Sequence, residues 1–428
     1  MASLHARLRP WWLALPLVCA CGDNAAPQGS ADAAPRPDGA PGVDAPAVVA
    51  DAAPPDAVER GPVTITVIGN DGLPDADAHV LFYDDADTLV EDVAVDGAGG
   101  ASVDLLRGGF AVILGVINNR ATVLADLDPG DEITYRAPRF YPTIDVNWTV
   151  PTYLGATAYR IHDISGQVEG PGPVVVKPTW SVPTTNVAAV ATAGGLPLAS
   201  LPAQDVAIFD GATPTLTGDW VEASTTTVTL AGVPAGWTSN GSVSSVSTGV
   251  TSVDGPAFVA GVATGPVLDL GDDRAMARVS LAEPGAFGQQ IVLRYLARGG
   301  AHTVDVADHV LPWFTSATWD MSARTFTVVF PDAVPQVDML YVTLFANDGS
   351  GRSWEIYGRR ADGFALPDLP AAYDAMDLGM ASVFISGPSL YRTDDATLAA
   401  AVRAAPVNAW FSSVHAVGTT VTLLSPGS

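Results

Sequence analysis

The sequence has 428 residues, which is too many for one ordinary hydrophobic core and predicts about two to four domains. Its 20 basic and 46 acidic residues give a formal charge of −26, so nucleic acid is excluded as a natural partner because its phosphates would be repelled. Hydrophobic residues make up 48% of the chain and charged residues only 15%, a balance typical of exposed β-sheets rich in Thr, Ser, Gly and Val.

Residues 1–20 have the three parts of an export signal. Arg7 and Arg9 supply a positive start, and the apolar run Trp11–Ala20 follows. This run is too short to span the roughly 30 Å hydrocarbon core of a membrane as a helix. We therefore predict a signal peptide. Because the signal holds two basic residues and no acidic ones, its removal makes the charge of the mature chain −28.

The signal ends in Val18-Cys19-Ala20-Cys21-Gly22. An aliphatic residue, then a small residue, then a cysteine resembles the lipobox of bacterial lipoproteins. The resemblance implies cleavage before Cys21 and attachment of a diacylglyceryl group to its thiol, so the chain is anchored to a membrane through its lipid. Cys19 fits less well, because Val18 would then occupy the small position. Gly22 is not the aspartate that retains enteric lipoproteins at the inner membrane, which favours an outer-membrane lipoprotein of the cell envelope that faces the periplasm or the surface.

Residues 21–61 comprise the lipidated cysteine and a linker of Ala, Pro, Asp and Gly. The linker has no aromatic residue and no periodic apolar face, so burial cannot offset the entropy of ordering it. Its prolines favour extended polyproline II and its acids repel one another. We predict a disordered, semi-rigid tether. The folded part after it has no cysteine, and its domains must be held together by packing without disulfides.

Alternating apolar strands begin at Val63, and residues 62–138 contain about seven of them. Asp-Gly, Gly-Gly and Pro-Gly turns separate the strands at the spacing of a small all-β sandwich. The expected strands are 63–68, 79–83, 90–95, 102–106, 110–116, 121–127 and 132–135.

The order of turns in this first domain resembles that of the carboxypeptidase-regulatory or prealbumin-like family. The resemblance is carried by Val67-x-Gly69 before Asp71-Gly72-Leu73-Pro74, by Val95-Asp96-Gly97-Ala98-Gly99-Gly100-Ala101, and by Leu127-x-Pro129-Gly130-Asp131. It covers only residues 62–138. It implies a non-catalytic accessory domain of β-sandwich fold whose Asn, Asp and Gly residues shape hairpin turns.

Residues 139–305 are also β-rich but less regular, and we predict one large sandwich or two small ones there. Within them, the Ser/Gly/Thr-rich stretch 237–253 predicts an exposed loop or an edge hairpin. Residues 306–428 predict a C-terminal sandwich with one short helix at 394–403, which starts with acidic residues that suit the positive end of a helix dipole. The fold class predicted for the chain is all-β, with tandem Ig-like and prealbumin-like sandwiches after a disordered Ala/Pro/Asp linker.

Residues that could carry chemistry are few. No serine stands in a Gly-x-Ser-x-Gly motif, and no histidine pair has the His-Glu-x-x-His spacing of metalloproteases. His302 and Asp308 could offer zinc ligands from one strand face, although a strand and its turn explain them as well. The histidines of the mature chain are His79, His162, His302, His309 and His415.

Acidic turns make calcium the metal that the sequence favours, because hard oxygen ligands on loops suit it. The first candidate turn contains Asp84, Asp85 and Asp87. None of these turns has the spacing of a helix-loop-helix calcium site, so plain turn residues are the alternative, and no other cofactor is expected. Two further acidic turns contain Asp126, Asp128, Asp131 and Glu132, and Asp272 and Asp273.

Trp237 and Trp313 lie near loops, where tryptophan can form a platform for sugar rings. The alternative is that they belong to the core. With no catalytic motif, we predict a non-enzymatic lipoprotein that displays sandwich modules for binding, adhesion or scaffolding toward an unknown protein or glycan partner. The alternative is a secreted hydrolase whose catalytic cleft lies in residues 139–305.

Overall fold

The computed structural model describes residues 60–116, 119–138, 141–285, 288–378, 382–405 and 416–425. Regular structure in these residues is almost entirely β-strand, which confirms the predicted all-β class. The predicted signal peptide, Cys21 and the tether lie outside the described residues.

The first sandwich, called sandwich 1, places one sheet of order β4-β1-β7 against the strands β3-β2-β5-β6. Apolar residues alternate along β1, where Val63, Ile65 and Val67 face the core. The bounds of its strands are β1 (Arg60–Ile68), β2 (His79–Tyr83), β3 (Leu89–Ala94), β4 (Gly100–Leu106), β5 (Gly109–Leu114), β6 (Arg120–Leu127) and β7 (Glu132–Arg136).

Sandwich 2 packs the pair β11-β8 against a sheet of order β10-β9-β12-β13-β14. Residues 212–216 run beside β8, where the Thr149 amide donates to the Pro214 carbonyl at 3.0 Å and the Leu216 amide to the Thr149 carbonyl at 2.8 Å. Its strands are β8 (Thr143–Thr149), β9 (Ala158–Asp163), β10 (Gly166–Gly170), β11 (Val174–Trp180), β12 (Thr184–Ala193), β13 (Leu196–Ala207) and β14 (Val221–Glu222).

Sandwich 3 packs the sheet β18-β15-β21 against the strands β17-β16-β19-β20. The Ser/Gly/Thr-rich stretch predicted as an exposed loop or edge hairpin is a hairpin of β16 and β17, and β17 is the outermost strand of its sheet. The strands are β15 (Ser224–Ala231), β16 (Thr238–Ser247), β17 (Val250–Ala257), β18 (Val262–Val267), β19 (Arg274–Ala282), β20 (Gln289–Ala297) and β21 (Gly300–Asp305).

Sandwich 4 packs the sheet β22-β23-β26 against the strands β25-β24-β27-β28. The predicted short helix forms as α1, and the Asp395 carboxylate caps it by accepting hydrogen bonds from the amides of Thr397 and Leu398. Its elements are η1 (Ala307–His309), β22 (Ser316–Asp320), β23 (Thr325–Val329), β24 (Met339–Ala346), β25 (Ser353–Gly358), β26 (Gly363–Ala365), η2 (Ala371–Tyr373), β27 (Val383–Thr393), α1 (Ala396–Ala404) and β28 (Thr420–Ser425).

The same strand order occurs in all four sandwiches. In each, the first strand pairs antiparallel with the fourth, as β1 does with β4 and β23 with β26. The second strand pairs with the third and the fifth, and the fifth with the sixth. In sandwiches 1 to 3 a seventh segment pairs in parallel with the first strand. In sandwich 4 the strand β22, which precedes β23 in the chain, occupies the same position but runs antiparallel. The chain is therefore built from one supersecondary unit used four times.

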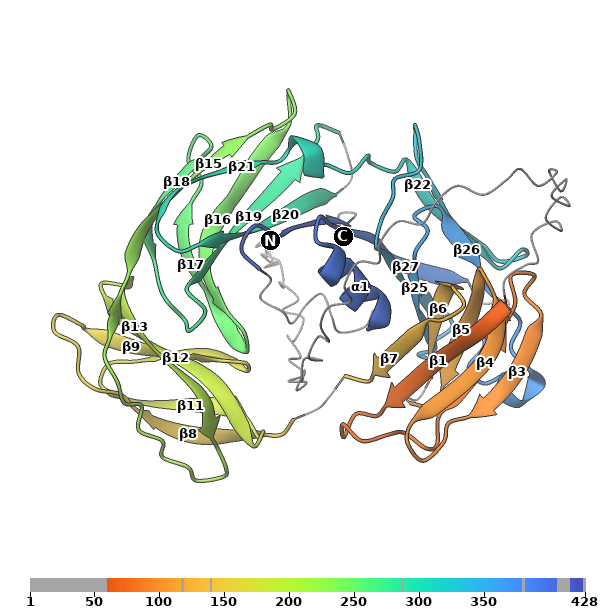
Figure 1. Ribbon diagram of the computed structural model, residues 1–428, viewed down its shortest axis with the longest axis horizontal. Helices are drawn as coiled ribbons and strands as arrows, with labels where there is room; N and C mark the ends of the chain where they lie inside the picture. Colours follow the sequence, from red (N-terminus) through yellow and green to blue (C-terminus); the bar gives the residue numbers. More distant parts are fainter. Residues whose placement is uncertain are drawn as a thin grey trace, which may run out of the picture.

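Three of these sandwiches share one continuous sheet of twelve strands. The edge strand β20 of sandwich 3 pairs antiparallel with β28 of sandwich 4, and β25 of sandwich 4 pairs in parallel with β6 of sandwich 1. Sandwich 2 packs on sandwich 3 through an apolar cluster that includes Val190 and Val253. Figure 1 shows the resulting arc, which runs from sandwich 2 through 3 and 4 to sandwich 1.

The chain does not follow the arc in order. It begins in sandwich 1 at one end, and the connection 137–142 leads directly to sandwich 2 at the other end (Figure 1). Fully extended, the chain from Arg136 to Thr143 spans at most about 25 Å. This connection therefore limits how far apart the two ends of the arc can lie.

The joint between sandwiches 1 and 4 is buried on both faces of the sheet. Every residue of β5 is buried, and its side chains alternate between two cores. On one face Val112 packs in the core that contains Trp354, and residues 366–378 cover that face with Leu366, Leu369 and Leu378. On the other face, Leu398 and Val402 of α1 close the core that contains Ile113. Apolar runs without alternation, such as β5, are the expected signal of strands covered on both sides.

The substitution Trp354→Ala tests this joint. The indole is fully buried in β25 and donates a hydrogen bond to the Met376 carbonyl at 2.9 Å. We expect a loss of about 3–5 kcal/mol in the free energy of unfolding, measured in urea, because the cavity would lie where two sandwiches meet. Leu154→Ala, at a side chain that is 96% exposed, should change it by less than about 0.5 kcal/mol. Similar losses for the two variants would contradict the proposal that the joint makes a large contribution to the free energy of unfolding.

Candidate functional site

The acidic turn at 126–132 is bound by one arginine side chain and two backbone amides of sandwich 4. The Asp126 carboxylate accepts hydrogen bonds from the backbone amides of Arg359 and Arg360 at 2.9 and 3.0 Å. The Arg359 guanidinium bridges Asp128 at 3.1 Å and Asp131 at 2.8 Å. Sequence reasoning assigned these carboxylates to a candidate calcium site, and the structure gives them a role at the joint between sandwiches 1 and 4.

The first calcium candidate is the turn after β2. Asp84 accepts hydrogen bonds from the amides of Ala86 and Thr88, so its carboxylate shapes the turn. Asp85 and Asp87 are exposed. Partial desolvation of its carboxyl group, together with the nearby carboxylates of Asp84 and Asp368, raises the pKa of Asp87 although the residue as a whole is exposed. In the described part of the chain, no three carboxylate, histidine or cysteine side chains are grouped as metal ligands, and calcium at this turn stays a prediction.

The remaining metal candidates have local partners. Asp272 accepts hydrogen bonds from the amide and hydroxyl of Thr248, and Asp273 forms an ion pair with Arg298 at 2.6 Å. His302 bonds to the backbone oxygen of Gly299 at 2.8 Å. His415 lies outside the described residues.

The two tryptophans predicted as a sugar platform lie together where sandwiches 3 and 4 meet. The rings of Trp237 and Trp313 have centroids 6.2 Å apart and are tilted by 45°. Each is half-buried, Trp237 against the core of sandwich 3 and Trp313 against that of sandwich 4. The two rings therefore lie between the cores of sandwiches 3 and 4 and do not form a flat, open platform.

A pair of hollows lies at one side of sandwich 4. Two hollows of about 600 and 580 Å³ adjoin, since both are lined by 334–336, Arg392 and Thr393. We call the two together the arginine groove. Its basic residues are Arg359 and Arg360 after β25, Arg392 at the end of β27, and Arg403 in α1.

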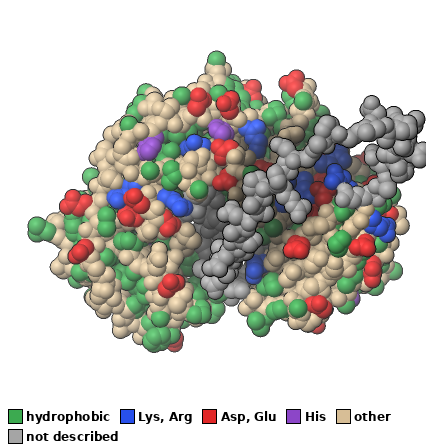
Figure 2. Space-filling model, in the orientation of Figure 1, with side chains coloured by type: hydrophobic (Ala, Val, Ile, Leu, Met, Phe, Trp, Pro, Cys, Tyr) green, Lys and Arg blue, Asp and Glu red, His purple; other side chains and the backbone are tan. Residues whose placement is uncertain are grey.

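Arginines are scarce in this chain, which has 20 basic residues against 46 acidic ones, and four of them line this groove. On the face shown in Figure 2, arginine side chains lie among acidic ones and do not form a separate patch. The groove follows this pattern, because Asp338, Asp362, Asp308 and Asp394 also line it. It is therefore locally close to neutral within a strongly acidic protein.

The four arginines differ in how many partners within the protein their guanidinium groups already bind. Arg359 is bound to Asp128 and Asp131, and Arg360 forms a two-pronged pair with Asp362 at 3.0 and 2.8 Å. Arg392 donates to the backbone oxygen of Asp308 at 2.7 Å and has no carboxylate partner among the described residues.

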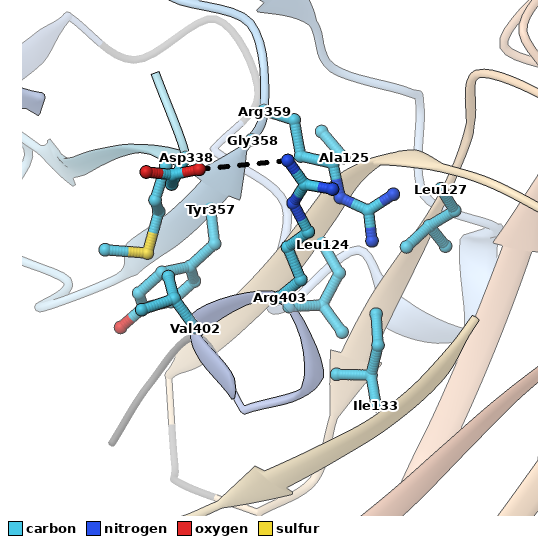
Figure 3. Close-up of a pocket in the computed structure, with 11 residues that line it drawn as sticks. Leu124, Ala125, Leu127, Ile133, Asp338, Tyr357, Gly358, Arg359, Val402 and Arg403 are labelled. Atoms are coloured by element: carbon cyan, nitrogen blue, oxygen red, sulfur yellow. Dashed lines mark ion pairs between the residues drawn. The ribbon is translucent and has the colours of Figure 1, made fainter. Parts of the chain in front are cut away.

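Arg403 forms one long ion pair, to Asp338 at 3.8 Å, and its side chain is 52% exposed. Figure 3 shows this pair above a small cavity of about 20 Å³, with the Arg359 side chain beside it. A guanidinium can donate five hydrogen bonds. Arg392 and Arg403 therefore keep donors for an anionic ligand in the groove, and sequence reasoning missed them because a single arginine carries no local signal.

The middle region contains the cores of sandwiches 2 and 3 and a buried polar cluster. Asp163, Lys177 and Thr179 are all buried in sandwich 2, and the Lys177 ammonium lies 2.6 Å from the Asp163 carboxylate. Sequence reasoning placed the hydrolase alternative in this region. The hollows described above are lined by residues outside 139–305, and the hydrolase alternative stays a prediction.

Comparisons with known proteins give no family. No family model and no curated protein matches the chain, so its resemblance to the prealbumin-like family stays a prediction. Solved structures that match include the Bacillus anthracis TIE protein (10% identity, 57% of this chain and 50% of that one, TM-score 0.16). They also include the BcpA major pilin subunit of Bacillus cereus (9% identity, 58% and 99%, TM-score 0.16) and a streptococcal ancillary pilin (11% identity, 58% and 98%, TM-score 0.16).

The chain spans about half the length of the TIE protein. TM-scores this low carry no argument about function, and the fold assignment rests on the sheets of this chain. Within the described residues, no helix is long and apolar enough to cross a membrane.

A buried histidine predicts how stability depends on pH. His162 is fully buried beside Thr251 of sandwich 3, and burial lowers its pKa to about 4. The unfolded chain, with a histidine pKa near 6.5, binds this proton first as pH falls. The neutral histidine's contribution is therefore complete above about pH 6.5 and is lost as pH falls toward 4.

Between pH 7 and 4.5, wild type should lose about 2–3 kcal/mol more of its unfolding free energy than His162→Gln, measured in urea. His79→Gln, at a side chain that is 40% exposed, is the matched control and should behave as wild type. Equal losses in wild type and His162→Gln would show that His162 is not the group responsible.

Proposed function

We propose that the protein is a non-enzymatic lipoprotein of the bacterial cell envelope, anchored through Cys21, which binds an acidic polysaccharide along the arginine groove. The observation that carries the proposal is that Arg392 and Arg403 keep spare hydrogen-bond donors in a groove that is close to neutral, on a chain with a formal charge of −26. Elsewhere so acidic a surface repels an anionic polymer, so binding is confined to this groove.

The lining of the groove fits a sugar acid better than a bare anion. Arg392 and Arg403 supply donors that suit a carboxylate, which arginine binds in a bidentate fashion. Val334 and Pro335 supply apolar surface for the carbon face of a sugar ring, and Gln336 and Thr393 supply hydrogen-bonding groups. Because two adjoining hollows share these residues, the groove has room for more than one sugar unit.

The fold supports a display role for this groove. It is formed by elements of sandwich 4 beside the joint where β25 pairs with β6 of sandwich 1, and the burial of that joint on both faces supports the wall of the groove that follows β25. A rigid binding surface loses little entropy when it takes up a ligand. A lipid on Cys21 and the Ala/Pro/Asp tether would hold it away from the membrane, with the outer membrane as the proposed site.

Binding is tested with a galacturonic acid trisaccharide by titration calorimetry. We expect Arg392→Ala and Arg403→Ala each to weaken binding about tenfold or more, because each removes charge-assisted hydrogen bonds. Arg278→Ala, at an exposed arginine of β19, is the matched control and should leave the affinity unchanged. Failure of wild type to bind the acid trisaccharide would refute the proposed ligand, and equal binding of inorganic phosphate would point to a small-anion site.

Anchoring is tested separately by metabolic labelling with a fatty acid and by membrane fractionation. We expect wild type and Cys19→Ala to take up label and to sediment with membranes. Cys21→Ala should do neither, because a stable anchor needs its acyl chains. Labelling that survives Cys21→Ala and disappears in Cys19→Ala would move the anchor to the other cysteine.

A further inference from the structure

Lys177 is the only lysine in the sequence, and its side chain is 1% exposed. It lies on β11, where Val175, Lys177 and Thr179 alternate with exposed residues and face the interior of sandwich 2. Lysine is almost never fully buried unless it is paired.

The partner is Asp163, the last residue of β9, which is fully buried. The Lys177 Nζ lies 2.6 Å from Asp163 Oδ1. Because β9 and β11 belong to different sheets, this contact crosses the core and joins the two layers of sandwich 2. The β11-β8 sheet has only two named strands, and so small a sheet depends on its contacts across the core.

Short hydrogen bonds surround the Asp163 carboxylate. The amide and hydroxyl of Ser165 donate to Oδ1 at 2.7 and 2.6 Å, and the Thr179 hydroxyl donates to Oδ2 at 3.0 Å. The Lys177 Nζ also lies 2.6 Å from Ser165 Oγ and 3.0 Å from the Pro178 carbonyl. The amine and the carboxyl group are thus fixed in contact with each other away from solvent.

A buried ion pair is costly, because the protein must remove both charges from water. Transfer of one proton from the ammonium to the carboxylate converts the pair into a neutral amine and a neutral acid. Burial disfavours the charged ammonium and lowers the pKa of Lys177. A neutral amine has the free electron pair that a nucleophile requires.

We propose that Lys177 and Asp163 condense to an amide that covalently joins β11 to β9. The Nζ electron pair attacks Cγ of the neutral acid, and the N–Cγ bond forms while the Cγ–Oδ2 bond breaks. Oδ2 keeps the acid proton, takes a second proton from the amine and leaves as water. The net change is the loss of one water molecule, with no oxidation or reduction.

The neighbouring residues have defined roles in this step. The Ser165 amide and hydroxyl stabilise the negative charge that develops on Oδ1, in the manner of an oxyanion hole. The Thr179 hydroxyl lies at Oδ2, where it relays a proton to the leaving oxygen. Both are positioning residues for a reaction that occurs once in each folded chain.

The single lysine makes the test direct. Purified full-length chain is unfolded in denaturant and treated with an amine-reactive reagent, then digested and analysed by mass spectrometry. We expect Lys177 of wild type to remain unlabelled. A peptide pair containing Asp163 and Lys177 should have a mass lower than the sum of its parts by one water molecule. Complete labelling of Lys177 and two separate peptides would overturn the proposal and leave a buried ion pair.

Two variants separate the crosslink from packing. Asp163→Ala removes the electrophile and should make Lys177 fully reactive toward the reagent in denaturant. Ser165→Ala keeps both partners and should slow the reaction, so that freshly folded protein contains a larger labelled fraction than wild type. If either variant fails to fold, the peptide masses of wild type alone still decide the question. This test does not depend on the arginine groove or on the anchor.

Discussion

The parallel pairing of β6 with β25 is the interaction on which the rest of the structure depends. It joins residues far apart in the sequence, with Arg120 opposite Ser353 and Val123 opposite Ile356, and makes one sheet of sandwiches 1, 4 and 3. Because the sheet continues through the joint, both of its faces must be covered there, by residues 366–378 on one side and by α1 on the other. The arginine groove lies beside this joint, where the residues that follow β25, residues 334–338, the end of β27 and Arg403 of α1 come together.

Opposite charges from sandwiches 1 and 4 meet at the same joint. The acidic turn of sandwich 1 would repel itself if it were left alone, and the Arg359 guanidinium and two backbone amides of sandwich 4 neutralise it. A chain with few arginines uses several of them here, where carboxylates from two sandwiches gather. Arg392 and Arg403 lie beside this network and keep hydrogen-bond donors that the protein does not use. The arrangement that closes the joint therefore leaves space and donors for a ligand.

The sequence could predict local structure but not long-range pairing. Alternation along β1 and the Asp-Gly turns determine strands and hairpins, and the predicted sandwich class followed from them. The strand β9 has a weak signal in the sequence, because its buried positions include His162 and Asp163, residue types that are usually exposed. The fourfold use of one strand order was also missed, because such a unit needs only apolar positions and turns, which different residues can supply. The partners of Arg359 were missed for a related reason, since they lie in another sandwich.

The order of the sandwiches along the chain has a consequence during synthesis. Sandwich 1 emerges first during synthesis, with the β6 edge unpaired and the outer face of β5 bare, and the strand that completes it is near the end of the chain. Until β25 is made, the nascent protein exposes an unpaired edge strand of the kind that promotes aggregation. Sandwich 4, which is made after the other three sandwiches, is therefore the one that covers the open edge of sandwich 1, and a chain released before β25 is made would expose a strand that the folded protein buries on both faces.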